Sequence, residues 1–144
     1  MLGPAFAHET PARSDAIEAD VPTEAKPWTS LEVNNAPELF RFAVVSDNAG
    51  GPRPGIFTEA MDKLNLMQPE FVMSIGDFIE GYEDTKAQLN VQWDRFLSDV
   101  AKLEMPFFFV PGNHDVGRPL WLQVYRERFG VPYFHFVYRN VLFL

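Results

Sequence analysis

Short apolar runs rich in β-formers alternate along the chain with amphipathic helical segments, and this alternation limits the fold more than any other feature. The predicted strands and helices are, in order, residues 40–46, 56–65, 71–75, 84–103, 106–110 and 119–129. A strand followed by a helix and another strand is typical of crossover connections, which place strands parallel in one sheet and helices on its faces. The alternation therefore predicts an α/β fold, with a β-sheet core flanked by helices.

The chain ends in a predicted hairpin. Two apolar runs at residues 133–138 and 141–144 flank a tight turn at Arg139-Asn140. The hairpin would be antiparallel, either at an edge of the parallel sheet or in a second sheet. Because the sequence stops inside the apolar strand NVLFL, we expect the chain to be the N-terminal part of a longer fold.

The first 39 residues differ in composition from the rest. They contain seven acidic residues, two basic residues and five prolines, and their apolar residues follow no sustained period. We expect a flexible acidic, proline-rich arm over residues 1–39, with local docking through Trp28 and Leu31. The folded domain would then span residues 40–144.

Charge and cysteine content exclude several classes of function. A net charge of −8 over 144 residues makes nucleic acid a poor partner, because no basic excess is present to neutralise phosphates. The absence of cysteine excludes disulfides, thiolate metal sites and a cysteine nucleophile. No apolar run approaches the roughly 20 residues of a membrane span, so we expect a soluble protein. The small-x-small triplet Ala5-Phe6-Ala7 leaves export open, and the sequence does not specify compartment or oligomeric state.

Polar clusters follow each of the three predicted parallel strands: Ser46-Asp47-Asn48, Gly76-Asp77, and Gly112-Asn113-His114-Asp115. Ligands of open α/β sheets bind beyond the carboxyl ends of the strands, so these clusters should lie close together. Neighbouring carboxylates repel one another unless a cation lies among them, and an oxygen-rich site with an imidazole suits Mn, Fe, Zn or Mg. The alternatives are local roles, in which the aspartates cap a loop or a turn and the last cluster caps a helix.

Gly76-Asp77 and Gly112-Asn113-His114-Asp115, after a strand that ends in Asp47, resemble the motifs of the calcineurin-like metallophosphoesterase superfamily. The similarity covers residues 41–144. The resemblance implies a metal-dependent phosphoesterase that hydrolyses phosphate mono- or diesters. It also implies two divalent metal ions and a metal-bound hydroxide as nucleophile.

The same resemblance implies a role for each polar residue. Asp47 would bind the first metal, Asp77 would bridge both metals, and Asn113 would bind the second through its side-chain oxygen. His114 would lie beside the phosphate, where it would steady charge or protonate the leaving group. Asp115 would orient the imidazole of His114.

The first motif departs from the family pattern. Ala49 and Pro52 occupy the two positions at which the superfamily or one of its branches has a histidine ligand. The later histidine segments of the family pattern would fall after Leu144. We therefore expect the 144-residue chain alone to bind metal weakly and to be inactive or weakly active. The alternative is a non-catalytic binding or structural module that keeps the fold, and a Gly-His-x-His segment downstream would favour the enzyme.

Overall fold

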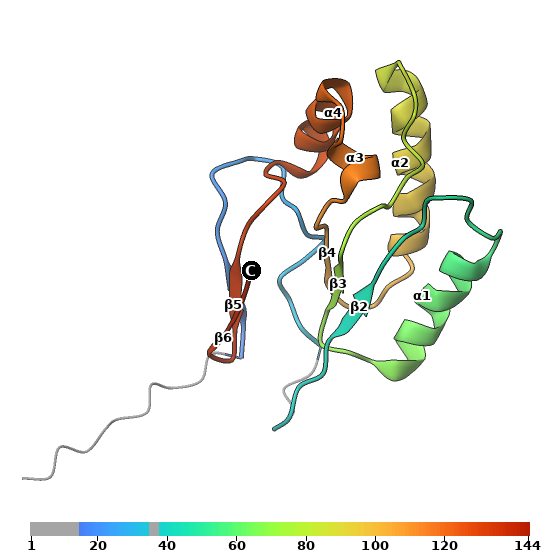
Figure 1. Cartoon of the computed structure of the whole chain (residues 1–144). Helices are drawn as coiled ribbons and strands as arrows, with labels where there is room; N and C mark the ends of the chain where they lie inside the picture. Colours follow the sequence, from blue (N-terminus) through green and yellow to red (C-terminus); the bar gives the residue numbers. More distant parts are fainter. Residues whose placement is uncertain (1–14, 35–37) are drawn as a thin grey trace, which may run out of the picture.

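A parallel three-stranded sheet lies between a helical layer and a second, antiparallel sheet in the computed structural model, which describes residues 15–34 and 38–144 (Figure 1). Its strands, in their order across the sheet, are β2 (Ala43–Val45), β3 (Val72–Ser74) and β4 (Phe107–Phe108). All three run parallel, with Val44 opposite Met73 and Met73 opposite Phe108. The predicted α/β fold is thereby confirmed, with strands shorter than the apolar runs that contain them.

Helices α1 (Ile56–Met67), α2 (Lys86–Val100) and α4 (Pro119–Phe129) match the three predicted helices to within a few residues, and a short helix that was not predicted, α3 (Asn113–Val116), lies between β4 and α4. The hydroxyl of Thr85 accepts a hydrogen bond from the Gln88 N–H and caps α2, and Pro119 suits the first position of α4 because its missing N–H would have no helical partner there. Helices α1 and α2 cover one face of the parallel sheet (Figure 1). Over residues 15–34 and 38–144, no helix has the length and apolar character needed to cross a bilayer.

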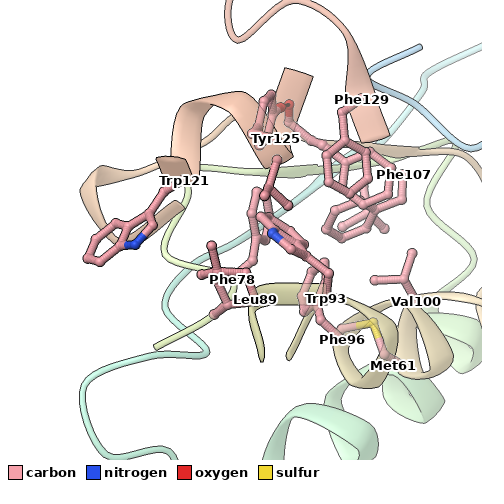
Figure 2. Close-up of a cluster of buried hydrophobic side chains, with 14 of the residues drawn as sticks. Met61, Phe78, Leu89, Trp93, Phe96, Val100, Phe107, Trp121, Tyr125 and Phe129 are labelled. Atoms are coloured by element: carbon pink, nitrogen blue, oxygen red, sulfur yellow. Dashed lines mark hydrogen bonds between the residues drawn. The ribbon is translucent and has the colours of Figure 1, made fainter. Parts of the chain in front are cut away.

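The main core fills the space between the helices and the parallel sheet. Figure 2 shows aromatic side chains of α2 and α4 packed on those of β4, with Trp93 and Phe107 fully buried. Successive strand residues point to opposite faces, so Phe107 and Phe109 join this core while Phe108 faces the second sheet. Burying each large apolar side chain contributes about 1.5–3 kcal/mol, so this packing fixes the strands whose ends carry the polar clusters.

The antiparallel sheet contains β1 (Ile17–Ala19), β5 (Phe136–Tyr138) and β6 (Val141–Phe143), in the order β1-β5-β6. Strands β5 and β6 form the predicted hairpin, and both turn residues, Arg139 and Asn140, have the positive φ of a tight hairpin turn. The hairpin thus lies in a second sheet, one of the two expected placements. Its aromatic side chains pack against Phe71 and Phe108 in a smaller core.

Residues 15–34, which belong to the expected acidic arm, contact both sheets. Strand β1 pairs with β5, and Trp28 forms an antiparallel bridge with Phe108. The Phe109 N–H donates to the Pro27 carbonyl at 2.9 Å, and the backbone around Trp28 thereby covers the open edge of β4. Trp28 and Leu31 both pack on the smaller core, as the sequence suggested. Residues 1–14, including Ala5-Phe6-Ala7, and residues 35–37 of the expected arm lie outside the described residues.

Candidate metal and phosphate site

The carboxyl ends of the three parallel strands meet at one edge of the sheet, where hydrogen bonds connect the segments that follow them. The Asp47 N–H donates to the Gly76 carbonyl at 3.2 Å, and the Asn48 N–H donates to the Asp77 carbonyl at 2.8 Å. The Oδ1 atom of Asp77 accepts from the main-chain N–H of His114 at 3.0 Å. The structure therefore brings the three polar clusters together, as the strand order predicted.

Two glycines allow the close approach of these segments. A Cβ atom at Gly76 would lie 2.2 Å from the Gly112 nitrogen, and one at Gly112 would lie 2.2 Å from Oδ1 of Asp77. Both distances are far shorter than a van der Waals contact. The glycines of Gly76-Asp77 and Gly112-Asn113 are thus needed for the packing of the strand ends, independently of any ligand.

The two aspartates that are candidate metal ligands both have a left-handed backbone conformation. Asp47 has φ of 45° and Asp77 has φ of 58°. Aspartate tolerates this conformation better than most residues, but it still costs free energy, and such costs concentrate at functional sites. Asp47 is exposed and accepts a hydrogen bond from the Ser46 hydroxyl, whereas Asp77 is half-buried.

Asp115 is fully buried, and its carboxylate accepts four hydrogen bonds from main-chain N–H groups. Its Oδ2 accepts from Gly112 and Asp77, both at 2.8 Å, and its Oδ1 accepts from Phe78 at 2.9 Å and Ile79 at 3.4 Å. Burial raises the pKa of Asp115 to about 6, and the main-chain donors act in the opposite direction. The carboxylate thus ties the loop after β3 to the loop after β4.

These contacts differ from the expectation that Asp115 orients the imidazole of His114. The Nδ1 atom of His114 instead lies 2.8 Å from the carbonyl oxygen of Glu80. Because a carbonyl oxygen only accepts, Nδ1 carries the hydrogen in this contact and Nε2 is left as the acceptor. The imidazole is therefore oriented by the loop after β3, and Asp115 acts on the main chain around it.

The remaining candidate ligand, Asn113, is exposed and begins α3. Within residues 15–34 and 38–144, no three His, Asp or Glu side chains gather closely enough to hold a metal ion. The donors at this edge are the carboxylates of Asp47 and Asp77 and the amide oxygen of Asn113. Oxygen donors of this kind fit a hard divalent cation, but three of them are too few for two ions, each of which takes four or more ligands.

A cavity of about 390 Å³ adjoins Asp47 on the side of α1. Arg53 contributes a cation to its wall, and Ile56 and Phe57 contribute apolar surface. Ala49 and Pro52 line the same cavity. A histidine at either position would thus share a cavity with Asp47, so the substitutions found here remove a candidate ligand at this point. The volume is in the range of pockets that bind small molecules.

The loop between β3 and α2 also lies at this edge, although none of the predicted site residues belongs to it beyond Asp77. Through the Glu80 carbonyl this loop contacts His114, and its Tyr82 ring lies against the His114 ring at a centroid distance of 5.2 Å. No apolar period marks such a loop, and its partners lie more than thirty residues away.

Fold and site together define an α/β domain with oxygen donors and an imidazole gathered at the carboxyl edge of a parallel sheet. A family model described as calcineurin-like phosphoesterase matches residues 40–143, which is more than half of the chain. The chain therefore belongs to this family, which confirms the resemblance of its motifs. Comparisons with curated proteins and with solved structures gave no significant match.

Proposed function

We propose that this domain serves a metal-dependent phosphoesterase that hydrolyses phosphate mono- or diesters. Membership of the calcineurin-like phosphoesterase family supports this function. The observation that carries it is the position of Asp77, whose carbonyl accepts from Asn48 and whose carboxylate accepts from His114. One residue thus connects all three strand ends, which is where a residue shared by two ions would have to lie.

Each side chain at this edge of the sheet would have a different role in the reaction. Asp47, Asp77 and Asn113 would hold divalent cation, and such a cation would stabilise charge on the phosphate and activate water. His114, with Nδ1 fixed on the Glu80 carbonyl, would present Nε2 as the atom that exchanges a proton or hydrogen bond with the ester. Asp115 would hold the two loops that carry Asp77 and His114 at a fixed separation.

The number of donors leads to a finer proposal about metal content. Three oxygen ligands leave two ions well short of their usual coordination, and Ala49 and Pro52 supply none. We therefore expect the 144-residue chain to bind Mn, Fe, Zn or Mg weakly, with the further ligands of a two-ion centre coming from outside this set.

A second candidate function is a non-catalytic module that keeps the fold. The loss of histidine at both Ala49 and Pro52, which line the cavity beside Asp47, favours it. The well-formed contacts of Asp77, His114 and Asp115 favour the enzyme, because a purely structural domain has no need of an imidazole whose Nδ1 is fixed on a main-chain carbonyl at the edge where Asp77 lies.

The test measures hydrolysis of 4-nitrophenyl phosphate and of bis(4-nitrophenyl) phosphate by the chain, with Mn, Zn or Mg in excess. We expect slow, metal-dependent turnover that is lost in Asp77→Asn, a change that keeps the side-chain shape and tolerates left-handed backbone. Asp62→Asn, at an exposed carboxylate on α1, is the matched control. Measurable wild-type turnover that Asp77→Asn retains in full would refute the role of Asp77. Calorimetric titration with the same metals should show weak binding, and tight binding of two ions would contradict the donor count.

A further inference from the structure

The tip of the loop between β3 and α2, residues 80–83, is fastened to the domain by side chains from two helices. Gln92 binds both main-chain groups of Gly81, accepting from its N–H at 3.0 Å and donating to its carbonyl at 3.1 Å. The indole N–H of Trp121 donates to the Glu83 carbonyl at 3.0 Å. Because the main chain is held at Gly81 and at Glu83, the loop has a defined path. The side chain of the residue between them is therefore held in one place on the surface.

That side chain is Tyr82, and its backbone is in an unfavourable conformation. Its φ is 56°, which is rare for a bulky residue and persists only where the surroundings enforce it. The side chain is nevertheless 64% exposed, so the conformation does not serve to bury the ring. It places the ring edge-on to two others, at centroid distances of 5.2 Å from His114 and 5.6 Å from Trp121.

Arg118 adds a cation to the same surface. Its guanidinium lies 4.7 Å from the centroid of the Trp121 ring and 5.9 Å from that of Tyr82. Its nearest carboxylate oxygen is on Asp84 at 3.7 Å, and that side chain is 94% exposed. A solvent-exposed ion pair of this length contributes little, so Arg118 keeps most of its capacity to contact a ligand.

We propose that Tyr82 and Arg118 form a subsite that binds the leaving group of the phosphate ester, and that this group carries a planar aromatic ring. The inference rests on the proposed function, because it is His114 that would place the phosphate next to Tyr82. Tyrosine rings and guanidinium groups both gain additional attraction from a flat π face, by stacking and by cation–π contact. A saturated group of equal size would gain only from buried area.

The experiment compares phenylphosphonate with cyclohexylphosphonate, which resist hydrolysis and have six-membered rings with and without a π face. Affinities are measured by NMR titration of the chain with Mg²⁺ present. We expect the wild type to prefer phenylphosphonate by about three- to tenfold, the range expected for one aromatic contact. Tyr82→Gly should reduce this preference to near unity, since glycine takes the positive φ without strain and keeps the loop path.

Two further variants separate stacking from structure. Tyr82→Phe retains the ring and should keep the preference, and Tyr133→Ala, at an 82% exposed tyrosine before β5, should leave it unchanged. Circular dichroism melting of each variant checks that the fold is retained. Arg118→Gln should lower the preference in part, because the exposed Tyr82 ring remains.

The outcomes distinguish this inference from the proposed function. Equal wild-type affinity for the two phosphonates, in a chain whose phosphonate binding is lost in Asp77→Asn, would overturn the role of Tyr82 and leave the phosphoesterase proposal standing. A preference that survives in Tyr82→Gly would overturn it as well. If neither phosphonate binds, this inference is overturned, and the proposed function is overturned as well if Asp77→Asn retains the full measurable turnover of the wild type.

Discussion

The carboxylate of Asp115 accepts a 2.8 Å hydrogen bond from the main-chain N–H of Asp77, 38 residues earlier in the chain. In return, the carboxylate of Asp77 accepts from the main-chain N–H of His114. The two aspartates therefore hold the loops after β3 and β4 against each other without bonding each other's side chains. This reciprocal arrangement fixes the relative position of a candidate metal ligand and of the candidate proton-transfer residue.

Replacing Asp115 by Asn should destabilise the protein substantially. An amide has one acceptor oxygen where the carboxylate has two, so at least one buried N–H loses its partner, and the amide NH₂ group is brought against other main-chain donors. Each unsatisfied buried donor costs about 1–3 kcal/mol, so we expect a loss of about 2–4 kcal/mol in the free energy of unfolding. Urea denaturation measures this change.

Asp62→Asn provides the comparison for that measurement, because Asp62 is an exposed carboxylate on α1. Surface substitutions of this kind usually change stability by less than about 0.5 kcal/mol. If Asp115→Asn cost no more than Asp62→Asn, the four main-chain bonds would not have the structural role assigned to them.

Adding a single methyl group at Gly112 should displace the carboxylate of Asp77. Gly112 has an extended backbone, so Gly112→Ala introduces no strain in φ, and its effect comes from the contacts of the new Cβ with Oδ1 of Asp77 at 2.2 Å and with the main-chain nitrogen of Asp77 at 2.6 Å. We expect weaker Mn²⁺ binding by calorimetry and loss of the phosphoesterase turnover, with the helices retained in circular dichroism. Unchanged metal affinity would show that Asp77 binds through a different rotamer from the one seen here.

The order of elements was predictable because each buried strand and each amphipathic helix has its own periodic signature. Helix α4, for example, runs over the predicted residues 119–129, where a proline marks the start and Gly130 follows the end. Strand β1 could not be predicted in the same way. It has three residues in an acidic, proline-rich segment, and its partner β5 lies over a hundred residues away, so nothing local identifies it.

The sequence predicted which segments meet at the site, but it did not predict the hydrogen-bond partners of the individual side chains. Strand order and parallel direction place Asp47, Asp77 and His114 at one edge, and the hydrogen bonds confirm this. The partner of the His114 imidazole could not be foreseen, because it is a main-chain carbonyl, and every residue has one. The main-chain donors to Asp115 could not be predicted for the same reason, and the sequence suggested the His114 imidazole as its partner instead.

Removing the imidazole of His114 should slow hydrolysis while leaving the metal in place. His114 is held by Glu80 and lies beside Asp77 through its main-chain N–H, which His114→Ala retains. Loss of a group that transfers a proton typically lowers turnover by about 10²–10⁴-fold. The measurement pairs kcat with metal content by atomic absorption, and a parallel loss of metal would mean that His114 is a ligand instead.

Tyr125 should make stability fall with pH in the alkaline range. Its hydroxyl donates to the Phe109 carbonyl at 2.7 Å in the core, and burial, followed by the nearby charge of Asp115, holds its pKa well above the ordinary value. The folded state therefore keeps this proton above about pH 10, where an unfolded tyrosine loses it. Since the unfolded state then binds fewer protons, the stabilising contribution is complete below pH 10 and is lost as the pH rises further, by up to about 1.4 kcal/mol per pH unit.

Tyr125→Phe has no hydroxyl to ionise at this position, so comparing it with the wild type isolates the pH dependence that is due to Tyr125. At pH 8 the variant should be less stable than the wild type by about 1 kcal/mol, because the Phe109 carbonyl loses its partner. Between pH 9 and pH 11 the stability difference should shift by about 1.4 kcal/mol in favour of the variant, which removes the deficit and slightly reverses it, since only the wild type releases the Tyr125 proton on unfolding. Tyr133→Phe, at an exposed position, should follow the wild-type pH profile throughout. Urea midpoints measured over this pH range decide the point: a deficit of Tyr125→Phe that stays constant with pH would mean that Tyr125 ionises as readily in the folded protein as in the unfolded chain.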